Sequence, residues 1–144
     1  MIKLALLNVL IAHPPPVNPA PPNFHQANQI EQSIKLIEKA GMGKKARWLQ
    51  RKHAAGKILV AERVFKDEPN FIGGRFWKGK VYIDTRLVFS SDLPRLLVHE
   101  SAHGTAGFFV SFWSDLVGGL GLCWDLEEQY ARRVHRRYLK LTME

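Results

Sequence analysis

The chain is 144 residues long, the size of one ordinary domain, and its hydrophobic content of 46% is enough to form a buried core. Charged residues make up 24% and aromatic residues 10%, which excludes global disorder, and a single cysteine, Cys123, excludes an internal disulfide. The net charge of +8 would suit nucleic acid, an anionic membrane or an acidic partner, and it does not choose among them.

The N-terminal residues fall into two short segments. Residues 1–12 carry one lysine and a short apolar stretch, without the length or the small-x-small cleavage site of a secretory signal peptide. Residues 13–22 read HPPPVNPAPP, a polyproline-like segment that suits either a linker or a strap lying on the core. We therefore expect an N-terminal apolar and proline-rich segment over 1–23 and one domain over 24–144. The expected location is the cytoplasm or that of a secreted effector.

Two helices and a small sheet are expected next along the chain. Isoleucines recur at helical spacing in residues 24–40, and a basic helix is predicted over 44–53. The Val- and Ile-bearing run 57–65 predicts a strand. Residues 75–84 predict a hairpin or a bent strand, with the bend at the Lys-Gly pair 78–79.

Two further helices complete a predicted α+β fold. Asp92 offers an N-cap side chain and Pro94 is tolerated in a first helical turn, so a helix carrying LPRLLVHESAH is expected to begin near Asp92. The last helix is expected over 123–141, after a glycine-rich turn at 118–121. The apolar run 106–122 between these helices is interrupted by serine, aspartate and glycine, so no transmembrane segment is predicted.

The motif that carries chemistry is H-E-x-x-H, formed by His99, Glu100 and His103 on the predicted helix. Its i, i+4 spacing places both imidazoles on one face, close enough to bind one zinc ion. Glu100 projects about 100° away from His99 around the helix, which is the position of a general base acting on water rather than of a ligand. The alternative is that all three are structural groups. A structural zinc site would need four protein ligands, often thiolates, so the lone Cys123 favours an open catalytic site.

With this motif the sequence resembles the HExxH zinc metallopeptidases, and among them the gluzincin-like group of small regulatory and toxin-type domains. The longer metzincin motif is absent, because Ala106 and Phe109 stand where it requires glycine and histidine. The resemblance implies a zincin-like fold, with a small mixed sheet, the HExxH helix, and a C-terminal helix that carries the third ligand. Glu128 and Ala131 match the E-x-x-A pattern of that helix, which makes Glu128 the first choice for this ligand.

Two other carboxylates near the start of the last helix remain alternatives as zinc ligands. The apolar residues of this helix are centred closer to Glu127 than to Glu128, and a carboxylate on an apolar face requires a partner. Asp125 is the third candidate. Acidic residues in a first helical turn also complement the helix dipole, which explains without a metal whichever carboxylates do not bind zinc.

The resemblance also implies a binding strand for an extended peptide. In such enzymes the strand just before the metal helix is the sheet edge that receives the substrate, and Val81, Tyr82 and Ile83 occupy that position here. Zinc would activate a water, and Glu100 would take its proton. His135 follows Glu128 by one heptad on nearly the same stripe, and it is either a catalytic donor or a structural histidine.

The expected function is therefore zinc-dependent hydrolysis of peptide bonds in a protein or peptide substrate. Basic runs at 44–52 and 132–140 are either solvated faces or phosphate contacts, and the second option would make the chain a DNA-associated protease. A non-catalytic module that holds zinc or a peptide is the other alternative, and the intact Glu100 argues against it.

Overall fold

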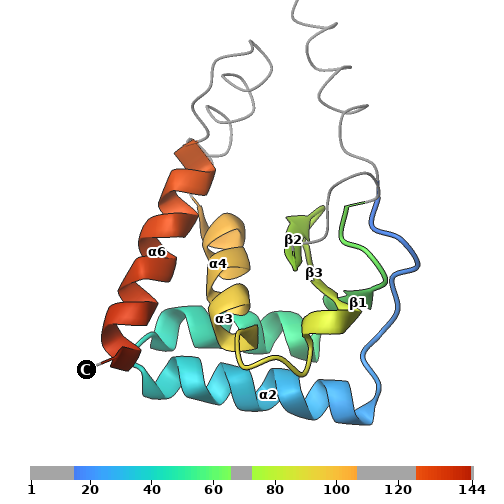
Figure 1. Cartoon of the computed structure of the whole chain (residues 1–144), viewed down its shortest axis with the longest axis horizontal. Coiled ribbons are helices and arrows are strands. Elements are labelled where there is room, and N and C mark those ends of the chain that lie inside the picture. Colours follow the sequence, from blue (N-terminus) through green and yellow to red (C-terminus); the bar gives the residue numbers. More distant parts are fainter. Residues whose placement is uncertain (1–14, 66–72, 107–125, 144) are drawn as a thin grey trace, which may run out of the picture.

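The computed structural model describes residues 15–65, 73–106 and 126–143. In these ranges the chain is an α+β fold with four α-helices and a three-stranded mixed sheet. Figure 1 shows α4 in the middle, with α6 on one side of it, the sheet on the other, and α2 and α3 across the base. None of the described helices is both long and apolar enough to cross a membrane.

The first two described helices match the predicted ranges closely. α2 (Phe24–Lys39) begins with a capping box, in which the backbone N–H of Gln26 donates to the side chain of Asn23 and the backbone N–H of Asn23 donates to the side chain of Gln26. It ends before Gly41, whose φ of 88° suits glycine. α3 (Gly43–Ala54) packs along α2. The predicted apolar stripe of α2 is buried at Ile30, Ile34 and Ile37.

The sheet has the order β1-β3-β2. β1 (Ile58–Ala61) runs parallel to β3 (Lys80–Asp84), and β2 (Gly74–Trp77) runs antiparallel to β3. The predicted hairpin is confirmed: Lys78 and Gly79 join β2 to β3 with φ values of 47° and 77°, as a two-residue type I′ turn requires.

The proline-rich segment covers the outer edge of β1. Val17 and Ala20 form antiparallel bridges with Arg63 and Val60, with N···O distances of 2.8 Å. Proline is tolerated at such a sheet edge because only alternate backbone groups need to pair. This pairing favours a strap on the core for residues 15–23. Strand β1 itself is shorter than the predicted range 57–65.

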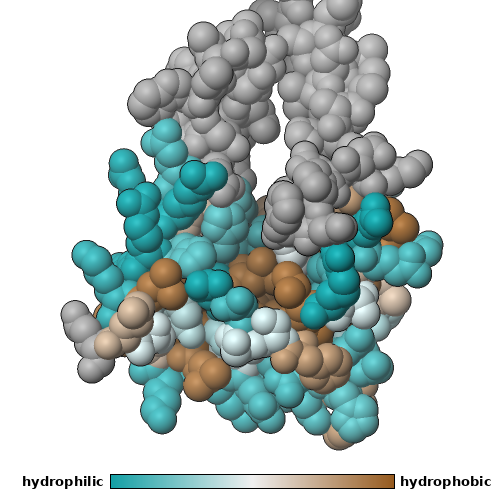
Figure 2. All heavy atoms as spheres, viewed as in Figure 1, coloured by the Kyte–Doolittle hydropathy of each residue, from teal (hydrophilic) through white to brown (hydrophobic). Residues whose placement is uncertain are grey.

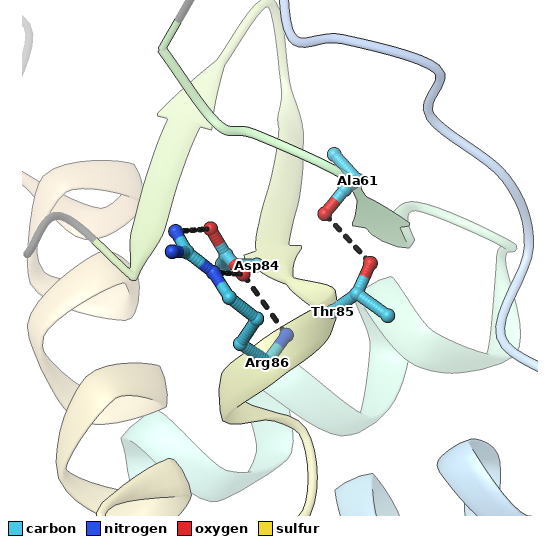
Figure 3. A network of polar contacts seen from close by, with 4 residues as sticks. All are labelled: Ala61, Asp84, Thr85 and Arg86. Carbon is cyan, nitrogen blue, oxygen red and sulfur yellow. Dashed lines mark hydrogen bonds and ion pairs between the residues drawn. The ribbon is translucent and has the colours of Figure 1, made fainter. Parts of the chain in front are cut away.

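A buried carboxylate closes the end of β3. Asp84 is 1% exposed and accepts hydrogen bonds from the backbone N–H of Arg86 (2.9 Å) and from its guanidinium (2.9 and 2.7 Å) (Figure 3). Thr85 Oγ1 donates to the carbonyl of Ala61 (2.9 Å). Burial alone would raise the pKa of Asp84, but the hydrogen bonds and charge of Arg86, with the charge of Arg63, outweigh it and hold the pKa below its usual value. The junction ties both parallel strands to the turn that leads to α4.

α4 (Leu93–Thr105) begins where the sequence predicts, with Pro94 in its first turn. Asp92 does not cap the helix with its side chain; it forms an ion pair with Arg95 (2.8 Å) instead. The backbone N–H of Asp92 donates to Ser90 Oγ (3.1 Å). α4 contacts α2, α3, α6 and β2, so it is the central helix of the fold.

α6 (Leu126–Met143) packs along α4 with one face. Ala131 and Tyr138 are buried on that face, and Val134 is partly buried beside them. Apolar residues from every described helix and from strands β1 and β3 meet in one core. This core comprises Ile30, Ile34, Ile37, Met42, Ala46, Leu49, Ile58, Val60, Val81, Ile83, Val88, Leu93, Leu97, Val98 and Tyr138.

Candidate metal centre

The two histidines of the H-E-x-x-H motif converge on one point. His99 and His103 lie one turn apart in the second half of α4, both partly buried, with their ring centroids 5.0 Å apart. Their Nε2 atoms are 3.2 Å apart. The i, i+4 spacing and the direction of side chains on a helix therefore bring two potential metal donors together without any long-range contact.

This separation fits a shared zinc ion. Two nitrogen ligands at about 2.05 Å from one tetrahedral zinc lie about 3.3 Å apart, close to the observed value. The same contact is a hydrogen bond if one neutral ring donates its Nε2–H to the other. Metal analysis distinguishes a shared zinc ion from a hydrogen bond between the two rings, because only the zinc site contains a metal.

Glu100 leaves the helix in a different direction and reaches the sheet. Its side chain is 5% exposed and packs against the backbone of Gly74 at the start of β2. A Cβ at Gly74 would lie 2.9 Å from Glu100 Oε1 and 2.9 Å from Leu96 Cδ1. Gly74 is therefore required by the close approach of α4 to β2, which fixes the position of the carboxylate.

A buried arginine on β2 supplies positive charge near Glu100. Arg75 is 5% exposed, donates from Nη1 to the carbonyl of Val64 (3.1 Å), and has the rings of Phe65 and Trp77 within 4.4 and 5.0 Å of its guanidinium carbon. Burial lowers the pKa of Arg75, while the nearby Tyr82 and Glu100 act in the opposite direction. The positive charge of Arg75 and the carboxylate of Glu100 attract each other across the contact between β2 and α4. The sequence does not reveal this role of Arg75, since a charged residue in a predicted strand gives no sign of burial.

His135 lies beside the histidine pair on the α6 side. Its ring centroid is 6.1 Å from that of His99, with the rings nearly perpendicular. Burial lowers the pKa of His135, the charges of Arg95 and His99 lower it further, and Asp92 acts in the opposite direction. The neutral imidazole is thus favoured, and the sequence-based alternatives of a catalytic or a structural role both remain predictions.

The three candidates for a third ligand, Asp125, Glu127 and Glu128, all have side chains outside the described part of the chain. Within the described ranges, no group of three His, Cys, Asp or Glu side chains gathers at one point. Asp125 is outside those ranges, whereas Glu127 and Glu128 belong to the first turn of α6. The choice among the three carboxylates therefore stays a prediction.

The strand that was predicted to receive the substrate is the middle strand of the sheet. Val81, Tyr82 and Ile83 lie on β3, which pairs with β1 on one side and β2 on the other. All three side chains are buried. The interpretation of this strand as an edge that receives a peptide is wrong, because its backbone groups are already used within the sheet. β2, at the edge of the sheet, contacts α4.

Two contacts from α3 secure the end of α4, and sequence analysis missed both. Trp48 lies against Gly104, where a Cβ would come within 2.2 Å of the indole. Lys45 Nζ donates to Thr105 Oγ1 and to Tyr130 Oη, the latter at 3.3 Å. Lys45 thereby joins α3 to α4 and α6 close to His103. The glycine directly after the motif, Gly104, was a signal for close packing by another side chain. Lys45 lies in a basic run, and nothing in the sequence indicates its contact with Thr105.

The chain matches no family model, and no curated protein and no solved structure shows significant similarity to it. The geometry of the described residues therefore carries the functional interpretation by itself.

Proposed function

We propose that this protein is a zinc-dependent peptidase of the HExxH type. The observation that supports it best is the pair of Nε2 atoms 3.2 Å apart on α4, with the carboxylate of the intervening glutamate buried on the adjacent face. Burying a carboxylate is costly unless charge or hydrogen bonds compensate it. A histidine pair with zinc-like spacing next to such a carboxylate is what metal-assisted hydrolysis requires.

The donor set suits zinc. His99 and His103 would hold the ion through Nε2, and Glu128, or alternatively Glu127, would supply the third protein ligand. Zinc in such a site lowers the pKa of a coordinated water towards about 7 and polarises a carbonyl group. Two imidazoles and one carboxylate leave one coordination position for substrate or water, whereas a structural site is closed by four protein ligands.

Glu100, Gly74 and Arg75 have separate roles in the proposed reaction. Glu100 accepts the proton of the attacking water and later donates it to the leaving amine. Gly74 leaves the space that the Glu100 side chain needs, and the positive charge of Arg75 attracts the Glu100 carboxylate. Arg75 thus acts through Glu100, as a positioning residue.

Metal content tests the first half of the proposal. Elemental analysis after gentle dialysis should find about one zinc per chain, since the proposed site has three protein ligands. His99→Ala and His103→Ala should lose it, whereas His25→Ala, at an exposed position on α2, should retain it. Full zinc occupancy in both motif variants would place the metal elsewhere and remove the basis of the proposal.

Hydrolysis tests the second half. Incubation with a diverse peptide mixture, followed by mass spectrometry of the products, should reveal metal-dependent cleavage. Glu100→Gln keeps the size of the side chain but cannot accept a proton, so it should retain zinc while the cleavage rate falls roughly 10²- to 10⁴-fold. Glu38→Gln on the exposed face of α2 is the matched control. Zinc binding with no cleavage by the wild-type chain would instead support a non-catalytic module.

A further inference from the structure

The outer face of α6 is a continuous basic surface, which we call the α6 basic face. It consists of five exposed side chains: Arg132, Arg133, Arg136, Arg137 and Lys140. These positions rise about 12 Å along the helix axis and span an arc of about 140°. Hydrophilic side chains gather over the upper part of α6, at the left of the view in Figure 2.

The α6 basic face points away from the core. At about 100° per residue, its centre lies about 180° from the buried side of the helix, which carries Ala131 and Tyr138. Residues 129–143 contain no aspartate or glutamate, so every charged side chain in this stretch of the helix is basic. The exposed face of α2 differs, because Glu31 and Glu38 alternate there with lysines. α6 therefore concentrates positive charge, whereas α2 balances it.

The chemistry of the α6 basic face suits phosphate groups. Four of its five cations are arginines, whose planar guanidinium matches phosphate oxygens in a bidentate manner. Duplex DNA carries one negative charge per about 1.7 Å of its axis, so a face about 12 Å long can meet several phosphates at once. The net charge of +8 adds long-range attraction to the same kind of partner.

Other anionic partners fit the α6 basic face less well. A helix that lies on a membrane needs an exposed apolar face beside its cations, but the apolar face of α6 is packed on α4. Single-stranded nucleic acid is held by aromatic side chains on which bases stack, and no aromatic residue lies within the arc. Tyr130, at its margin, is engaged with Lys45. The regular phosphate array of a duplex can be bound by cations alone.

We propose that the α6 basic face binds the backbone of a nucleic-acid duplex, DNA or RNA, without sequence preference. This inference is independent of the zinc site, because no residue of the face belongs to that site and none of the proposed contacts involves a metal.

Salt-dependent binding tests the proposal. Fluorescence anisotropy with labelled DNA and RNA duplexes of about 20 base pairs should give a log–log slope of affinity against salt of about −3 to −5, one unit for roughly each phosphate contact. Arg133→Gln/Arg137→Gln should flatten this slope by about 2 and weaken binding at low salt about tenfold or more. Arg136→Gln/Lys140→Gln, an independent pair on the same face, should behave in the same way.

A matched pair on α3 controls for net charge. Arg47→Gln/Arg51→Gln removes two exposed arginines at the same i, i+4 spacing, and it should leave the slope unchanged. Absence of salt-dependent duplex binding, or equal losses from the α3 and α6 pairs, would overturn the proposal. Tighter binding to a single strand, or binding only to vesicles that contain phosphatidylserine, would overturn it as well. Zinc content and helical circular dichroism should be the same in all variants.

Discussion

α4 and α6 pack side by side, yet they place their polar residues in opposite ways. α4 keeps Glu100 and Ser101 inside the fold, at 5% and 0% exposure, while all four arginines of α6 are exposed. Exposed arginines cost the fold little, whereas a buried carboxylate is costly unless it is compensated. Ser101 donates to the carbonyl of Val98 within the helix, so the buried Glu100 is the residue of this pair that calls for an explanation by function. The arginines of α6 call for one because they gather on one face of the helix.

Truncation of apolar side chains should show the largest difference between the two helices. Leu97 on α4 is fully buried, and Leu97→Ala should lower the free energy of unfolding by about 2–5 kcal/mol through lost transfer energy and a cavity. Leu141→Ala on α6 removes the same atoms from a side chain that is 40% exposed, so it should cost less than about 1 kcal/mol. Urea denaturation measures both. Equal losses would mean that α4 is not the central helix.

Substitution of the two neighbouring glutamates at the start of α6 should have different effects on zinc affinity. Glu128→Ala should weaken zinc binding by more than the roughly 10–100-fold typical of residues that only support a ligand. Glu127→Ala should have little effect, because adjacent helical residues point about 100° apart. Competition titration with a chelator resolves the two variants. The reverse pattern would assign the role to Glu127, and no effect from either would remove the gluzincin-like ligand set while leaving the histidine pair.

A methyl group added between α4 and β2 should lower the stability of the fold by a smaller amount than Leu97→Ala does. Gly74→Ala places a methyl group 2.9 Å from both Glu100 Oε1 and Leu96 Cδ1, so it should cost about 1–3 kcal/mol of stability and slow peptide cleavage. Gly43→Ala at the start of α3 meets only the flexible end of the exposed Arg47, at 3.3 Å, and should change stability by less than about 1 kcal/mol. Thermal unfolding of both variants, with cleavage assays, measures the difference.

The smallest effect should come from acid titration of the sheet junction. The folded-state pKa of Asp84 is held below its unfolded value, so its stabilising contribution is complete above about pH 4 and is lost as the pH falls through the folded pKa. Asp84→Asn should therefore be less stable than the wild type at neutral pH and approach it in acid. The difference should be about 1 kcal/mol, because solvent screens the half-exposed Arg86. A gap that stays constant from pH 7 to about pH 2 would contradict this account.

Local patterns in the sequence determined the elements and their order. The ranges of α2 and α3 follow from apolar spacing and from breaking glycines, and the turn at Lys78 and Gly79 follows from a short-range preference for positive φ. The closeness of His99 to His103 was also predictable, since both lie on one helix and need no partner.

Tertiary structure alone decided what surrounds these elements. The central position of β3 depends on a parallel partner about twenty residues earlier, and a short apolar strand does not show which of its edges are paired. The burial of Arg75, the packing of Glu100 on Gly74 and the contact of Lys45 with Tyr130 each join residues distant in the chain. Backbone spacing within one helix fixes which groups can act together, but burial and charge depend on neighbours that only the folded chain supplies.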